Sequence, residues 1–190
     1  MKALEQKILN EGKVFPGNIL KVSGFLNHRL DVDFLMEMGE EIARLYSGCG
    51  VNKILTVEAS GIAIAVCAAS KMHVPVVFAK KGLTSNLQSE VYSTPVQSFT
   101  HGKIYNVMVS KEYLSEKDSV LIIDDFLANG NAMKGLIDII KQAGGQVIGC
   151  AAAIEKGFQK GGDNLRKAGI RVESLAIIDE MTDTNVKFRQ

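Results

Sequence analysis

Short apolar segments alternate with helical segments from about residue 50 onward, and this alternation limits the folds open to the chain. Each apolar segment is a near-continuous run of core-type residues, which is typical of strands that are covered on both faces. A segment of small apolar residues through Met72 and a segment from Gly130 to Ala143 have helical patterns. The alternation predicts an α/β fold, with a mainly parallel sheet and helices on both faces. The expected strands are KILTV (53–57), PVVFAKK (75–81), SVLII (119–123), GQVIGCAAAIE (145–155) and RVESLAII (171–178).

The first 37 or so residues follow a different pattern. MKALEQKILNEG (1–12) interleaves charged and apolar residues at helical spacing, whereas a signal peptide needs an uninterrupted apolar stretch of roughly 7 to 15 residues. Residues 13–30 mix proline and glycine with short apolar pairs, which favours strand and loop. Asp31 or Asp33 then caps a helix that begins at Phe34. We expect residues 1–190 to form a single domain, to which residues 1–37 add a small N-terminal subregion.

Charge and cysteine content exclude several classes of partner. Lys and Arg number 22 against 21 Asp and Glu, so the net charge of +1 gives no reason to expect nucleic acid or an anionic membrane. The longest nearly uncharged stretch, residues 60–70, is shorter than the roughly 20 residues that span a bilayer. Cys49, Cys67 and Cys150 lack Cys-x-x-Cys spacing, which predicts buried thiols in a reducing cytoplasm. Because the net charge is close to zero, any phosphate site must depend on a few nearby residues and not on the overall charge of the chain.

Two adjacent carboxylates, Asp124 and Asp125, interrupt VLIIDDFLANGNA (120–132) where an expected strand ends. Ligands of open α/β sheets bind beyond the carboxyl ends of the strands. The small residues behind the pair lead into a helix whose first N–H groups lack partners, which predicts a phosphate site at Ala128, Asn129, Gly130, Asn131 and Ala132. The carboxylates would repel that phosphate, so they need hydroxyl groups, a cationic centre or a divalent metal.

The same stretch has a plainer interpretation, in which Asp125 caps the next helix and Asp124 is a solvated strand end. It matches neither Gly-x-Gly-x-x-Gly nor the Walker A pattern, which disfavours a dinucleotide or triphosphate. A phospho-acceptor aspartate is a further alternative, but the small residues behind the pair suit a ligand loop better. A phosphorylated sugar with free hydroxyls and a carbon that becomes cationic would satisfy both parts of the stretch.

VLIIDDFLANGNA is similar to the phosphoribosyl pyrophosphate (PRPP) motif of type I phosphoribosyltransferases, where an apolar strand leads to two acidic residues and a 5'-phosphate loop. Many members have a Thr-Gly-Gly-Thr loop, whereas residues 128–132 here offer backbone and amide donors but no hydroxyls. FLANG resembles the branch of this purine family that uses xanthine. The likeness covers essentially the whole chain, through GNILKVSGFLNH (17–28), ILTVEASGIAIAV (54–66), PVVFAKK, AAIEKGFQ (152–159) and GIRVESLA (169–176).

The resemblance implies a type I phosphoribosyltransferase fold with an N-terminal hood. It implies transfer of 5-phosphoribose from PRPP to N9 of xanthine, which gives xanthosine 5'-monophosphate (XMP) and pyrophosphate in purine salvage. Mg²⁺ would be bound with PRPP and not by a dedicated protein site, and the enzyme would be a homodimer. Asp124 and Asp125 would be catalytic. The implied pyrophosphate contacts are Glu58, Ala59, Ser60, Gly61, Lys80 and Lys81, and the implied base contacts are Leu20, Asn27 and Lys156.

Taken alone, most of these residues also have structural interpretations. Residues 57–62 could be a plain tight turn, and a lysine that follows a strand is usually a solvated charge. Residues 89–103 resemble the family's mobile catalytic loop, but their composition fits an exposed hairpin equally well. Phe126 or Phe158 could stack on the base, although core packing is the commoner role. His28, His73 and His101 share no spacing that suggests a metal site.

Base choice and fold leave two alternatives to xanthine transfer. Xanthine presents carbonyl oxygens at positions 2 and 6, which require donors such as Lys156, while the amino group of adenine requires an acceptor. Guanine and hypoxanthine share the 6-oxo group and so remain alternatives. A PRPP-sensing regulator that binds nucleic acid is the second, but the chain has no basic winged-helix extension and its charge is balanced.

Overall fold

The computed structural model, which describes residues 1–82, 90–97, 104–182 and 184–190, is built around an eight-stranded sheet. The strands lie in the order β10-β9-β8-β7-β3-β4-β6-β5, and those from β9 to β4 pair in parallel. Antiparallel strands complete both edges. The strands are β3 (Lys53–Val57), β4 (Val76–Lys81), β5 (Val91–Gln97), β6 (Ile104–Ser110), β7 (Ser119–Leu127), β8 (Gln146–Lys156), β9 (Val172–Met181) and β10 (Val186–Phe188).

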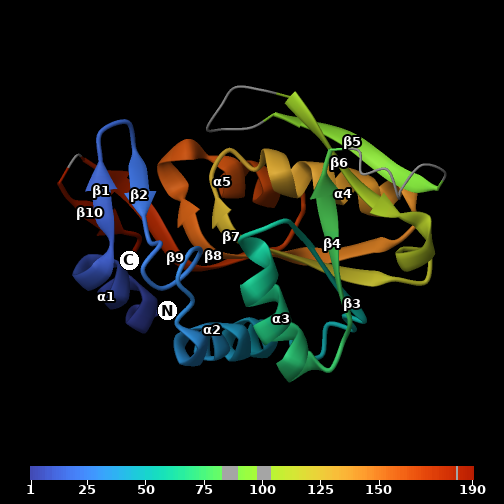
Figure 1. The fold of residues 1–190 in the computed structure, drawn as a ribbon, viewed down its shortest axis with the longest axis horizontal. Coiled ribbons are helices and arrows are strands. Elements are labelled where there is room, and N and C mark those ends of the chain that lie inside the picture. The colour runs from blue at the N-terminus through green and yellow to red at the C-terminus, as the bar shows by residue number, and fades with distance from the viewer. Residues whose placement is uncertain (83–89, 98–103, 183) are drawn as a thin grey trace.

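Helices cover both faces of the sheet, with α2 (Val32–Leu45) and α3 (Gly61–Met72) on one and α4 (Asn131–Gln142) and α5 (Gly161–Lys167) on the other (Figure 1). Two 3-10 turns, η2 (Lys111–Tyr113) and η3 (Gly157–Gln159), follow β6 and β8. None of the described helices is long and apolar enough to cross a membrane.

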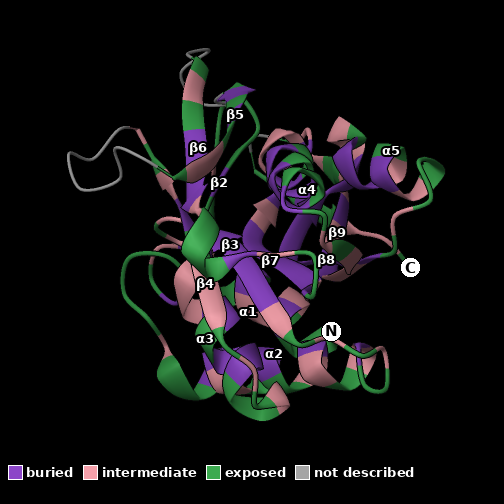
Figure 2. Cartoon of the chain, turned by 90° about the vertical axis from the view of Figure 1, so that its right-hand side faces the viewer, coloured by how far each residue is buried: buried purple, intermediate pink, exposed green. Residues whose placement is uncertain are grey.

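Each face of the sheet has its own apolar core, because successive side chains of a strand point in opposite directions. Along β7, Leu121 and Ile123 pack in the core under α2 and α3, while Val120 and Ile122 pack in the core under α4. Figure 2 shows the buried strands enclosed between these helices. The predicted α/β sheet with both faces covered is confirmed.

The N-terminal segment consists of α1 (Lys2–Glu11) and a separate antiparallel pair, β1 (Lys13–Phe15) and β2 (Ile19–Lys21). Leu4 and Ile8 of α1 are buried in the core of the α2 and α3 face. Lys7 lies 2.8 Å from the carboxylate of Asp31, which also caps α2 by accepting from the Phe34 N–H. The segment is therefore attached to the main core, and both chain ends lie on its side of the molecule (Figure 1).

Strands β5 and β6 form a hairpin. β5 and β6 pair antiparallel from Val91↔Ser110 to Gln97↔Ile104, and β6 adds to the sheet beside β4. Of the predicted catalytic loop at 89–103, residues 90–97 are described and nearly all belong to β5, whereas residue 89 and residues 98–103, which include His101, lie outside the described residues.

The strand that carries the acidic pair is longer than predicted. β7 runs four residues past SVLII, so Asp124 and Asp125 lie inside a strand and not at its end. Its pairing with β3 stops at Ile122, whereas its pairing with β8 continues to Leu127. The acidic pair therefore lies beyond the end of the β3–β7 pairing but is still held by β8.

The prediction of three buried thiols is wrong for one cysteine. All three are free, and Cys67 and Cys150 are buried, but Cys49 is only half-buried. Cys49 lies in the turn after α2, where its Sγ is 3.3 Å from the guanidinium of Arg171. A turn residue has no sheet or helix face to bury it, which accounts for the difference.

Gly39 permits the close contact between α2 and α3. A Cβ at this position would lie 2.6 Å from the carbonyl carbon of Cys67 and 2.7 Å from the nitrogen of Ala68. We predict that Gly39→Ala lowers the free energy of unfolding by about 1–3 kcal/mol in urea denaturation, because backbone must move to make room. Glu37→Ala, at an exposed position of the same helix, should change it by less than about 0.5 kcal/mol. A Gly39→Ala variant as stable as the parent would contradict this account.

Candidate active site

One cavity of about 700 Å³ lies between the carboxyl ends of the central strands and the N-terminal segment. Strands β3, β4, β7 and β8 end at this edge because they run in parallel. The predicted site residues that line it are Leu20, Asn27, Glu58, Ser60, Lys81, Asp124, Asp125, Ala128, Asn129, Gly130, Asn131, Ala132 and Lys156.

The acidic pair lies in the wall of this cavity, with Asp124 7% and Asp125 6% exposed. The Asp125 N–H donates to Asp124 Oδ1 at 2.9 Å, and the Asn27 amide donates to Asp125 Oδ2 at 3.1 Å. Burial, with the adjacent charge of Asp125, raises the pKa of Asp124 well above its usual range. The pair thus places negative charge where solvent stabilises it poorly.

The loop that follows the pair offers backbone donors. Gly130 has φ of 79°, a left-handed conformation that suits glycine and turns the chain directly into α4. Gly130 is the N-cap residue of α4 and has no side chain to cap the first N–H groups of the helix, which carry the positive end of the helix dipole. The Asn131 amide donates to the carbonyl of Gln97 at 3.3 Å and so ties the start of α4 to β5. Anion binding at this loop therefore relies chiefly on the backbone.

The turn from Glu58 to Gly61 packs against the acidic pair. A Cβ at Gly61 would lie 2.3 Å from Thr56 Oγ1 and 2.9 Å from Asp124 Oδ1, so only glycine fits there. Glu58 accepts the backbone N–H of Lys81 at 2.5 Å, and the Glu58–Ala59 peptide is cis. Glu58 and Ser60 line the cavity, while Ala59 and Gly61 complete the turn between and beside them.

The two adjacent lysines diverge at the end of β4. Lys81 lines the cavity, with its Nζ 5.5 Å from the ring centre of Tyr105. Lys80 lines a different pocket, which it shares with Lys53. Neighbouring side chains of a strand point to opposite faces, so only one of the two lysines can point into the cavity that holds Asp124 and Asp125.

All three predicted base contacts line the cavity, and one of them, Asn27, donates to Asp125. The Lys156 ammonium donates to the carbonyl of Asn18 at 2.9 Å and lies 5.7 Å from the ring centre of Phe126. Burial lowers the pKa of Lys156. Leu20 adds an apolar contact, and Phe126 lines the cavity, while Phe158 packs against the core. The end near Lys156 thus combines apolar surface with a cationic donor.

A family model of the phosphoribosyl transferase domain matches residues 35–184. This chain belongs to the phosphoribosyltransferase family. It is 54% identical to xanthine phosphoribosyltransferase 2 of Clostridium botulinum and 54% identical to xanthine phosphoribosyltransferase 1 of Clostridium perfringens, over the full length of each chain. The predicted family membership is confirmed.

Solved structures support the fold of this phosphoribosyltransferase. The Giardia lamblia APRTase complexed with 9-deazaadenine aligns with a TM-score of 0.79 at 20% identity, covering 94% of this chain and 98% of that one. Adenine phosphoribosyltransferase from Thermoanaerobacter pseudethanolicus aligns with a TM-score of 0.73 at 22% identity, covering 92% and 98%. At these identities the likeness concerns the fold, and it confirms the predicted type I architecture.

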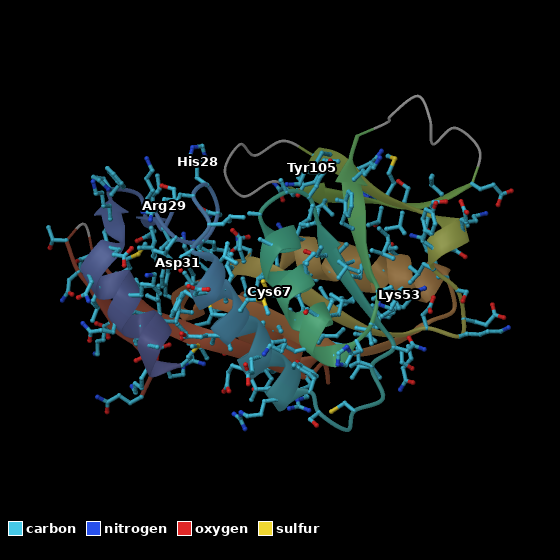
Figure 3. The ribbon with its side chains drawn as sticks, turned by 60° about the horizontal axis from the view of Figure 1, so that its bottom comes forward. His28, Arg29, Asp31, Lys53, Cys67 and Tyr105 are labelled. Atoms are coloured by element: carbon cyan, nitrogen blue, oxygen red, sulfur yellow. The ribbon has the colours of Figure 1, made fainter. Side chains whose placement is uncertain are left out.

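Several residues of the phosphoribosyltransferase site were not predicted from the sequence. Asn18, Gln97 and Tyr105 also line the cavity. Tyr105 lies on β6 and His28 on the N-terminal segment (Figure 3). His28 contributes to a smaller recess beside the cavity and His73 is exposed at the end of α3. Side chains alternate between the two faces of a strand such as β6, but the sequence does not say which face meets a ligand, so Tyr105 could not be assigned to the site.

The raised pKa of Asp124 predicts an effect on the stability of this phosphoribosyltransferase. When the pKa of an aspartate is higher in the folded chain than its unfolded value of about 3.9, the folded chain becomes less stable as pH rises from about 3.9 toward the folded pKa. Asp124→Asn removes this cost, and its amide oxygen can still accept the Asp125 N–H. We predict a higher Tm at pH 7, by about 2–4 °C for each kcal/mol gained, and a shrinking difference toward pH 4.

Differential scanning calorimetry of parent and variant across this pH range checks the prediction. Asp138→Asn is the matched control, because Asp138 is exposed on α4 and its change should be within about 0.5 kcal/mol. An Asp124→Asn variant with an unchanged or lower Tm at pH 7 would show that the buried carboxylate is not destabilising.

Proposed function

We propose that this phosphoribosyltransferase transfers 5-phosphoribose from PRPP to N9 of xanthine in purine salvage, giving XMP and pyrophosphate. The observation that carries the proposal is the buried acidic pair, which lies in one cavity with the backbone-rich loop 128–132 and with Lys156. Full-length identity of 54% to xanthine phosphoribosyltransferases supports the choice of base.

PRPP would lie along the cavity with each of its groups near a different element. The 5'-phosphate would bind the N–H groups of Ala128–Ala132 at the start of α4. The pyrophosphate would bind the turn from Glu58 to Gly61, with Lys81 as the neutralising cation. Lys80 is less suited to this role because it lines a different pocket. The 2'- and 3'-hydroxyls of the ribose would then donate to Asp124 and Asp125.

The reaction is a displacement at the anomeric carbon of the ribose by a purine nitrogen. The bond to pyrophosphate breaks with its electron pair, so positive charge develops on the ribose ring in the transition state. Asp124 and Asp125 would stabilise this charge because they lie in a cavity wall where water screens them poorly. Asn27 helps to orient Asp125. Binding and orientation, without a covalent nucleophile, account for the mechanism.

Mg²⁺ fits this site as an ion that arrives with PRPP. Asp124 and Asp125 carry carboxylate oxygens, which are the kind of atom that Mg²⁺ prefers, but their proposed partners are the ribose hydroxyls. Among the described residues, no three His, Cys, Asp or Glu side chains converge as a metal site. The pyrophosphate and ribose oxygens of PRPP would hold the ion, which would neutralise charge on the leaving group.

The N-terminal segment, residues 1–37, would act as a hood over the base. Leu20 and Asn27 come from this segment, and Lys156 donates to the carbonyl of its Asn18. Lys156 would donate to an oxo group of xanthine, while the apolar surface of Leu20 and the Phe126 ring would contact the purine plane. We also propose that the enzyme is a homodimer in the cytoplasm, as the family resemblance implies.

A panel of bases tests the proposed reaction. We expect the protein with PRPP and Mg²⁺ to convert xanthine to XMP with a higher kcat/KM than guanine, hypoxanthine or adenine. Lys156 as a donor disfavours adenine, and the 54% identity to xanthine phosphoribosyltransferases favours xanthine among the oxo-purines. Product formation is followed by chromatography of the nucleotides. Faster turnover of another base would refute the base choice, and a salt-dependent shift of DNA or RNA without transferase activity would favour a regulator.

Lys156→Met tests the role of the cationic donor in base choice. A charged hydrogen bond contributes about 1.5–3 kcal/mol, so kcat/KM for xanthine should fall roughly 10–100-fold and the preference for xanthine over hypoxanthine should decrease. Lys167→Met, which removes an exposed lysine of α5, is the control. Loss of activity by the same factor for every base would argue against a role in selection.

A further inference from the structure

A buried ion pair lies behind the loop proposed to bind the 5'-phosphate. Glu155 of β8 is 0% exposed. Arg166 of α5 donates to both of its carboxylate oxygens, at 2.9 and 2.7 Å, and Ser174 of β9 donates a hydroxyl at 2.5 Å. A fork of two parallel hydrogen bonds fixes direction as well as distance. Helix α5 is therefore held in one orientation relative to the sheet.

Two glycines connect this ion pair to the loop. Gly162 lies on the carboxylate, since a Cβ there would be 2.1 Å from Glu155 Oε1. Gly161 lies on the loop, since its Cβ would be 2.1 Å from the carbonyl oxygen of Ala128. The Gly161 N–H donates to this same oxygen at 3.1 Å. The loop thus contacts the backbone of α5, and α5 contacts the carboxylate of Glu155, without a side chain between them.

Other contacts restrain α5 only weakly. The helix has seven residues, GGDNLRK, and Leu165 is its one apolar side chain that enters the core. A single leucine fixes how deeply a short helix is buried but not its rotation. The second carboxylate near Arg166, that of Asp163, is 3.5 Å from Nη1 and partly exposed, so solvent weakens it. Arg166 Nε also donates to the carbonyl of Val172 at 3.3 Å, and Asp163 lies 3.7 Å from Arg189. The fork to the buried Glu155 carboxylate is the shortest of the described side-chain contacts of α5, so it contributes most to the position of Gly161.

We propose that Glu155 is a positioning residue for the 5'-phosphate, acting through Arg166 and the start of α5 on the backbone of loop 128–132. Glu155 does not line the cavity, and its carboxylate is bound to Arg166 and Ser174 and not to the neighbouring Lys156, so the route from Glu155 to the substrate is the loop. The inference rests on the proposed function, which identifies the ligands. PRPP and XMP carry the 5'-phosphate, whereas xanthine and pyrophosphate do not. A substitution of Glu155 should therefore weaken the binding of PRPP and XMP but not that of xanthine and pyrophosphate.

Steady-state kinetics of Glu155→Gln in both directions of the reaction test this selectivity. The neutral amide keeps the shape of the side chain but loses the charged hydrogen bonds. We expect KM for PRPP and for XMP to rise about tenfold, because small misplacements of binding groups have large effects. KM for xanthine and for pyrophosphate should stay within about twofold of the parent values. Arg166→Lys, which keeps the charge but loses the fork, should give the same pattern with smaller changes.

Glu173→Gln is the matched control, because it breaks an exposed ion pair with Arg171 at 3.0 Å on the same β9 that carries Ser174. All four KM values should then match the parent. Equal changes in all four KM values of Glu155→Gln, or no change, would overturn the proposal, since a merely structural role has no reason to select ligands by their phosphate. If Glu155→Gln shows no cooperative unfolding transition, Arg166→Lys decides by the same pattern.

Failure of the proposed function gives a different result. A parent enzyme that transfers phosphoribose to another base would refute the choice of xanthine, and the four KM values would then be measured with that base and its nucleotide. A parent that binds PRPP without transferring it would refute the transferase function. In that case calorimetric titration with PRPP and with pyrophosphate alone applies the same criterion, with weaker binding of PRPP only expected for Glu155→Gln.

Discussion

The burial of two adjacent carboxylates at the end of the β3–β7 pairing is the constraint on which the rest of the site depends. Asp124 and Asp125 repel each other and are poorly solvated, so the surrounding chain must hold them in place. Continued pairing of β7 with β8 fixes the backbone, Asn27 donates to Asp125, and Gly61 brings the start of α3 against Asp124. The cavity has its position because these elements converge on the pair.

Backbone contacts join the loops around the cavity, and they explain why small residues recur there. Gly61 meets the Asp124 carboxylate, and Gly161 meets the loop that contains Ala128 and Gly130. Side chains at these glycines would separate segments that are distant in the sequence. An anion site made of backbone N–H groups needs this closeness, because its donors cannot extend toward the ligand as a lysine can. The glycines are therefore needed for the close approach of the segments around the site as well as for the turns in which they lie.

Strands and helices were predictable because apolar runs and helical periodicity reflect burial directly. The end of β7 was not, because the charges of Asp124 and Asp125 interrupt the apolar run while backbone pairing with β8 continues. Lys80 and Lys81 were indistinguishable as neighbours in the sequence, since only the register of β4 decides which one faces the cavity. Glu155 gave no signal because its partners, Arg166 and Ser174, come from two later elements.

Burial disfavours the charged forms of two groups that line the cavity. It raises the pKa of Asp124 and lowers the pKa of Lys156. The proposed substrates reverse both effects, because a ribose that gains positive charge favours ionised Asp124 and an oxo-purine favours protonated Lys156. Substrate binding and the ionisation of these two groups are then linked, so each makes the other more favourable. The charged forms of Asp124 and Lys156, which burial destabilises in the free protein, are then stabilised most in the transition state. Stabilising the transition state raises the rate of the reaction.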